Sequence, residues 1–177
     1  MTALSIGEKA KPFSLPATNG EEYSLASFDG SSLLAVIFSC NHCPYVQAWE
    51  DRMVQIQADY EDKGVQLVAI NANDASKYPD DDFESMKARA NEKSFNFPYL
   101  RDESQEVAEA YGAERTPEVF LFDSDRELVY HGAIDDNYDD PGSVNAAYMR
   151  DAIEAVLTGG EPEVKNTSPV GCTIKWK

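Results

Sequence analysis

The chain has 177 residues, of which 42% are hydrophobic, so it can fill one core but is short for two ordinary domains. Its 32 acidic residues outnumber 15 basic ones and give a net charge of −17, which argues against nucleic acid and membrane surfaces as partners. The first residues lack the basic start and apolar stretch of a signal peptide, and no apolar run reaches the roughly 18 residues of a membrane span. We therefore expect a soluble, cytoplasmic protein.

The first half of the chain has the pattern of a β-α-β unit behind a hairpin. Asn19 and Gly20 favour a tight turn between two short extended stretches. The apolar run Leu33–Phe38 is continuous, as in a strand covered on both faces. An amphipathic helix from Val46 to Tyr60 separates it from a second buried strand, Val65–Ile70. This order predicts parallel strands and an α/β fold.

The second half alternates amphipathic segments with two strands joined by a polar turn. Asp102 and Gln105 resemble a capping box at the start of a short helix, and Gly159 closes a last helix. In chain order, the expected elements are the strands Phe13–Leu15, Tyr23–Leu25 and Leu33–Phe38, the helix Val46–Tyr60, the strand Val65–Ile70, the helix Asp81–Ser94, a helix from Asp102 to Gly112, the strands Val119–Phe122 and Leu128–Tyr130, and the helix Val144–Leu157.

Two cysteines carry the chemistry that the sequence predicts. Cys40 directly follows a buried strand and Cys43 lies where the amphipathic helix begins, which predicts both sulfurs in the first helical turn. Unpaired N–H groups at that position stabilise a thiolate, so we expect Cys40 to be the more exposed thiol, with a lowered pKa, and to act as nucleophile. Cys43 is then the resolving thiol, which attacks the mixed disulfide on Cys40. Pro44 is compatible with the first helical turn.

His42 lies between the two cysteines and is expected to tune them. A partly positive imidazole beside Cys40 stabilises the thiolate and shifts the couple toward a more oxidising potential. The alternative is a solvated loop residue without a role.

The motif Phe38-Ser-Cys40-Asn-His-Cys43 after a buried strand, together with Thr116-Pro117 before a second one, resembles the thioredoxin superfamily over residues 6–157. The resemblance implies a thioredoxin fold, with a central mixed β-sheet flanked by helices on both faces. It also implies that Pro117 is a cis-proline facing the cysteines and that Thr116 offers its backbone to a bound substrate.

The hairpin and the extra helix before Pro117 look like the redoxin branch, which includes alkyl hydroperoxide reductase/thiol-specific antioxidant (AhpC/TSA) proteins and thioredoxin-like reductases. The implied function is thiol-disulfide exchange in cell redox homeostasis with protein or small-molecule thiol and disulfide partners, without a cofactor. Peroxidase activity is an alternative, but Ile37 occupies the position where peroxiredoxins carry Thr or Ser. Leu34 occupies the position of a buried Asp in thioredoxin, so the proton acceptor for Cys43 is not identified.

Metal binding is the second hypothesis. A copper chaperone of the Sco type would use Cys40, Cys43 and a distant His131, although its cysteines are spaced more widely. A structural zinc site needs four ligands, which these residues supply only awkwardly, so no metal is expected. Glu118 has two interpretations, a proton relay to Cys43 or a surface carboxylate at the start of a strand.

The segment 161–177 has no periodicity and is expected to be a tail that docks on a domain formed by residues 1–160. Its lysines complement the acidic body, and Ile174 and Trp176 would bury apolar area on docking. Cys172 is either a third redox thiol that reaches the site or a small hydrophobic residue packed far from it. The packing interpretation is favoured, because free cysteine is commonly buried for packing alone.

Overall fold

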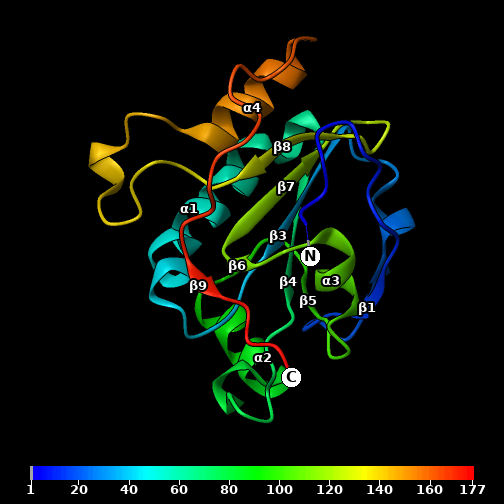
Figure 1. Ribbon diagram of the computed structural model, residues 1–177, viewed down its shortest axis with the longest axis vertical. Coiled ribbons are helices and arrows are strands. Elements are labelled where there is room, and N and C mark those ends of the chain that lie inside the picture. Colours follow the sequence, from blue (N-terminus) through cyan, green and yellow to red (C-terminus); the bar gives the residue numbers. More distant parts are fainter. Residues whose placement is uncertain (1) are drawn as a thin grey trace.

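A computed structural model describes residues 2–177. Its centre is a five-stranded mixed sheet of order β5-β4-β3-β7-β8, shown in Figure 1. The central strand β3 pairs parallel with β4 and antiparallel with β7, with Val36 opposite both Val68 and Phe120. The sheet strands are β3 (Leu33–Phe38), β4 (Val65–Asn71), β5 (Tyr99–Arg101), β7 (Glu118–Phe122) and β8 (Leu128–Gly132).

Helices cover one face of this sheet, and a helix with two extended segments covers the other. Trp49 of α1 (Pro44–Tyr60) and Ile153 of α4 (Tyr148–Leu157) pack with the β3 side chains of the first face, as does Met86 of α2 (Phe83–Glu92). The second face carries α3 (Glu106–Tyr111), the hairpin β1 (Ser14–Pro16) and β2 (Glu22–Ser24), and Ile174 near the carboxyl terminus. The predicted thioredoxin fold is confirmed, and β3 is buried along its whole length because both faces are covered.

Segments outside the sheet lie along both of its outer strands. Beside β8, His131 and the chain at Lys165 to Thr167 exchange backbone hydrogen bonds of 2.9 and 3.0 Å. Beside β5, the N–H of Thr18 donates to the carbonyl of Tyr99 at 3.0 Å.

The last residues of the chain form a strand of their own. β9 (Cys172–Thr173) pairs antiparallel with β6 (Arg115–Thr116), the short strand before Pro117, in a register that sets Cys172 opposite Thr116. Figure 1 shows this segment, in red, running from α4 past β6 to the end of the chain. Among the helices of residues 2–177, none has the length and apolar character needed to cross a membrane.

The helices α2 and α4 begin later in the structure than expected. α2 begins at Phe83 and is capped by Asp82, because Pro79–Asp81 forms a separate 3-10 turn, η3. α4 begins at Tyr148, since Val144 after the 3-10 turn η4 (Pro141–Ser143) is extended and the chain up to Ala147 is irregular. The remaining short turns are η1 (Leu25–Phe28) and η2 (Glu61–Lys63).

The capping box expected at α3 is absent. The Asp102 carboxylate accepts from the N–H of Ala108 at 2.9 Å, while the Gln105 side chain donates to the carbonyls of Ala72 and Lys175. Gln105 therefore holds the carboxyl-terminal segment rather than the helix.

Candidate active site

The two cysteines of the motif lie in the loop between β3 and α1. Cys43 is the N-cap of α1 and Pro44 is its first residue, so Cys40 lies before the helix rather than in its first turn. The side chains of this loop are covered: Cys40 is 2% exposed and Cys43 is 0% exposed. Cys40 is the more exposed of the two, as expected, but only marginally, and Cys172 of the carboxyl-terminal segment packs on the pair. All three cysteines of the chain are free thiols.

Thr116, the last residue of β6, contacts the sulfurs of both Cys40 and Cys43. The bond from Thr116 to Pro117 is cis, as the resemblance implied. The Thr116 hydroxyl lies 3.5 Å from Cys40 Sγ, and the Cys43 thiol can donate to the Thr116 carbonyl, also at 3.5 Å. The structure therefore brings together residues that are far apart in the sequence.

Asp81 is a residue of the site that the sequence analysis missed. Its buried carboxylate accepts hydrogen bonds from the Asn41 backbone N–H at 2.7 Å and from the Asn71 and Asn73 side-chain amides. Its second contact with the cysteine loop is His42, whose Nδ1 lies 2.5 Å from Asp81 Oδ2. Asp81 thus holds the loop that carries Cys40 in place.

His42 lies partly at the surface, with 32% of its side chain exposed. Its ring stacks on Tyr78, with centroids 6.0 Å apart and planes 2° from parallel. One ring nitrogen belongs to the Cys40 and Asp81 cluster, in which the candidate ligand atoms lie within 4.8 Å of one another. The tuning role of His42 stays a prediction, but its place beside Cys40 is as expected.

Cys172 lies at the site and not far from it. It packs on the cluster of Cys40, Cys43 and Val46, close enough to Cys43 to lower the pKa of that thiol. The favoured packing interpretation, which placed it elsewhere, is therefore wrong. Pairing of β9 with β6 is what brings it here, and neither short strand has a sequence signal.

The three thiols differ in acidity. Hydrogen bonds from Cys40 and then from Cys172 lower the pKa of Cys43 to about 4, against the opposing effect of its burial, and the Val46 N–H at the start of α1 adds to this. The shared hydrogen bond, burial and the charge of Asp81 raise the pKa of Cys40 above its ordinary value. Burial and the neighbouring Cys43 raise the pKa of Cys172 to about 11.

The expectation that Cys40 has a lowered pKa is therefore wrong. The helix terminus acts on Cys43, because that residue is the N-cap, and Asp81 adds a negative charge beside Cys40.

The copper ligand set is not assembled. His131 Nε2 pairs with Glu118 Oε2 at 2.7 Å and is not grouped with the cysteines. The cluster that could hold a metal is Cys40, His42 and Asp81, which offers three ligand atoms and includes neither Cys43 nor His131.

Glu118 is 1% exposed and not a surface carboxylate. Its Oε1 accepts from the N–H groups of Glu114 and Arg115 at 3.0 and 2.9 Å, and its Oε2 pairs with His131. Oε1 therefore supports the turn that leads into Thr116, and Oε2 links β7 to His131 of β8.

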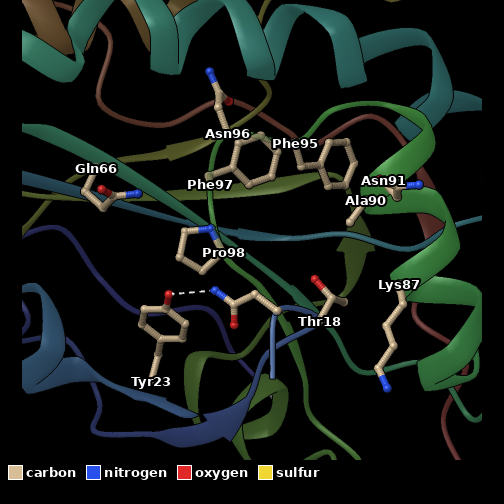
Figure 2. A pocket seen from close by; sticks show the side chains of 11 residues that line it. Thr18, Tyr23, Gln66, Lys87, Ala90, Asn91, Phe95, Asn96, Phe97 and Pro98 are labelled. Atoms are coloured by element: carbon tan, nitrogen blue, oxygen red, sulfur yellow. Dashed lines mark hydrogen bonds between the residues drawn. The ribbon is translucent and has the colours of Figure 1, made fainter. Parts of the chain in front are cut away.

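A separate cavity lies away from the cysteines. It has a volume of about 470 Å³ between the N-terminal hairpin, α2 and the loop before β5, and Figure 2 shows Thr18, Lys87 and Phe95 on its walls. No cysteine or histidine lines it.

Known proteins resemble this chain in sequence and in structure. The family model that matches residues 6–131 describes the AhpC/TSA family. The thiol-disulfide oxidoreductase ResA of Halalkalibacterium halodurans is 25% identical over 123 residues, which cover 70% of this chain and 65% of that protein. The chain thus spans about two thirds of the length of this curated relative.

Two solved structures match almost the whole chain. A hypothetical protein from Sinorhizobium meliloti 1021 is 39% identical with a TM-score of 0.93, covering 99% of this chain and 97% of that one. An uncharacterized conserved protein from Geobacillus kaustophilus is 41% identical, also with a TM-score of 0.93, covering 98% of this chain and 93% of that one.

Proposed function

Because this chain belongs to the AhpC/TSA family, in the redoxin branch of the thioredoxin superfamily, we propose that it is a thiol-disulfide oxidoreductase that cycles Cys40 and Cys43 between a dithiol and a disulfide. The observation that carries the proposal is the packed pair of free thiols at the start of α1, which Thr116 contacts on both sulfurs. The similarity to ResA supports the same chemistry.

The exchange begins with the proton that Cys40 and Cys43 share. When that proton lies on Cys43, the Cys40 thiolate has the Thr116 hydroxyl as a donor and can attack one sulfur of a partner disulfide. The disulfide bond of the partner breaks, a mixed disulfide forms on Cys40, and the departing thiolate takes the proton from Cys43. The Cys43 thiolate then attacks Cys40 Sγ, which releases the second partner thiolate and leaves the Cys40–Cys43 disulfide.

Partners of this exchange are protein or small-molecule thiols and disulfides. A role in cell redox homeostasis and a cytoplasmic location stay predictions, which depletion of the protein and cell fractionation test. The peroxidase alternative gains no support from Ile37, because its apolar side chain is fully buried in β3 and cannot donate to a peroxide.

The test is reduction of a small aromatic disulfide by the protein, with dithiothreitol as electron source. We expect Cys40→Ser to abolish turnover and Cys43→Ser to accumulate a mixed disulfide on Cys40, visible as a mass increase of the intact protein. Turnover by Cys40→Ser at the wild-type rate would refute the proposal. Thiol titration with and without a chelator excludes or reveals a metal that protects the thiols.

A further inference from the structure

We propose that Cys172 is a third redox thiol that forms a disulfide with Cys43, so that the bond of the oxidised protein can move from Cys40–Cys43 to Cys43–Cys172. This inference rests on the proposed function, because it needs a redox-active Cys43. It assigns to the carboxyl-terminal segment a chemical role beyond covering the site.

Cys43 is the branch point of the three thiols. It packs with Cys40 in one buried cluster, and Cys172 packs against the same cluster, close enough to lower the pKa of Cys43. The antiparallel register of β6 and β9 sets Cys172 directly opposite Thr116, the residue whose carbonyl and hydroxyl contact Cys43 and Cys40. Cys43 therefore lies within reach of two alternative sulfur partners.

The segment that carries Cys172 is anchored on both sides of it. Before it, the Gly171 carbonyl accepts from Arg115 Nη1 at 3.0 Å, and a side chain at Gly171 would meet the Thr116 carbonyl. After it, the Ile174 N–H donates to the Glu114 carbonyl at 2.9 Å, and the Ile174 side chain is only 3% exposed. Cys172 is thus held at the site, which makes its reaction with Cys43 intramolecular and correspondingly fast.

The exchange is balanced without any further reactant. The Cys172 thiolate attacks Cys43 Sγ of the Cys40–Cys43 disulfide, the bond to Cys40 breaks, and Cys40 leaves as a thiolate that takes up the proton given up by Cys172. One disulfide is replaced by another and there is no net oxidation. Cys40 becomes a free thiol, and the carboxyl-terminal segment becomes covalently attached to the loop at the start of α1.

The acidity of Cys172 favours this step in the oxidised protein. In the dithiol form, the Cys43 thiolate helps to hold the pKa of Cys172 at about 11. That negative charge disappears when Cys43 is bonded to Cys40, while Lys175 and Arg115 continue to lower the pKa of Cys172. The Cys172 thiolate is therefore more available when there is a disulfide for it to attack.

Cys172 is also the partly exposed member of the trio, whereas the other two sulfurs are buried. A bond at Cys172 would accordingly place the disulfide where a small external thiol can reach it. Attack on Cys172 Sγ by such a thiol would release Cys43 as a thiolate, and a second external thiol would free Cys172.

The experiment compares Cys40→Ser with its matched control Cys43→Ser, each oxidised under native conditions with oxidised glutathione. Intact mass and peptide mapping after alkylation then identify the products. We expect Cys40→Ser to form an intramolecular Cys43–Cys172 bond, and Cys43→Ser to become glutathionylated with its remaining cysteines unlinked. Crosslinking should be at least about tenfold faster in Cys40→Ser, and denaturant should remove the difference because it removes the native contact.

Two results would overturn the inference: a glutathionylated Cys43 beside a free Cys172 in Cys40→Ser, or equal crosslinking in the two variants. The wild-type protein separates this failure from failure of the proposed function. If wild type forms the Cys40–Cys43 bond and Cys40→Ser forms none, only the role of Cys172 is wrong. If wild type forms no disulfide at all, the proposed function fails.

Discussion

Replacing Gly171 with alanine should detach β9 from β6 while leaving the rest of the fold in place. A Cβ on Gly171 would lie 2.0 Å from the Thr116 carbonyl oxygen and 2.6 Å from its carbon. Both are backbone atoms beside the active cysteines, so no flexible side chain can move away. Ordinary contact begins near 3.4 Å, so the two strands must separate by roughly 1.4 Å.

The free energy of this change follows from the contacts that hold the strand. The hydrogen bonds from Arg115 to Gly171 and from Ile174 to Glu114 each contribute about 0.5–1.5 kcal/mol. Partial exposure of Ile174 forfeits some of the roughly 1.5–3 kcal/mol that full burial of such a side chain provides. The free energy needed to open the structure locally at the cysteines should therefore fall by about 2–4 kcal/mol. The fraction of molecules in which the cysteines are accessible then rises at least about 30-fold.

Thiol labelling of the reduced protein measures that population. We expect Cys40 and Cys43 to react with iodoacetamide at least about 30-fold faster in Gly171→Ala, with peptide mapping to assign each site. Gly30→Ala is the matched control, because a Cβ there has no neighbour within 4 Å. If folded Gly171→Ala is labelled at the wild-type rate, the carboxyl-terminal strand does not control access to the site.

Three further predictions concern acidity and stability. The pKa of Cys43 falls from 9.0 in the unfolded chain to about 4 in the fold, so the folded protein binds fewer protons between these values. The free energy of unfolding should therefore rise with pH from about 4 to 9, and this contribution should be lost as the pH falls through 4. Urea unfolding of the reduced proteins at several pH values should show that Cys43→Ser lacks this rise. The same pH dependence in wild type and in Cys43→Ser would contradict the prediction. Asp81→Asn should lower the pKa of Cys40 by about one unit, because it removes a negative charge within 4.8 Å of the sulfur. The substitution is made in Cys43→Ser, so that Cys40 titrates without its partner thiol. Thiolate absorbance at 240 nm measures the pKa, and an unchanged pKa would mean that solvent screens the charge of Asp81. Glu118→Ala should lower the free energy of unfolding by about 2–4 kcal/mol, since it removes the buried carboxylate that accepts from two backbone N–H groups. Glu118→Gln keeps an acceptor and should cost less, and equal losses would rule out this explanation.

The parts of the fold that could be predicted are those with a local signal. The continuous apolar run of β3 and the stripe of α1 result from burial on two faces and on one face, so their residue patterns predict them. Cys40, Cys43 and Pro117 were found because short motifs carry them.

The missed features depend on contacts across the chain. Asp81 belongs to a run of three aspartates, which resembles a solvated helix start, and only the path of the loop after β4 buries it against Asn41 and His42. Cys172 reaches Cys43 through a two-residue strand without periodicity. The acidity of Cys40 was misjudged for the same reason, since Asp81 is distant in sequence and close in space.

The segments along the outer strands have a consequence for experiments on the carboxyl terminus. An unpaired strand edge is a template for association with another chain, and Lys165 to Thr167 occupies that edge at β8, as the N-terminal hairpin does at β5. A truncation after Gly160 would uncover the β8 edge and the cysteines together, so self-association would obscure any gain in thiol reactivity. A single substitution at Gly171 opens the site and keeps the β8 edge closed, and thereby protects the protein from aggregation while its chemistry is measured.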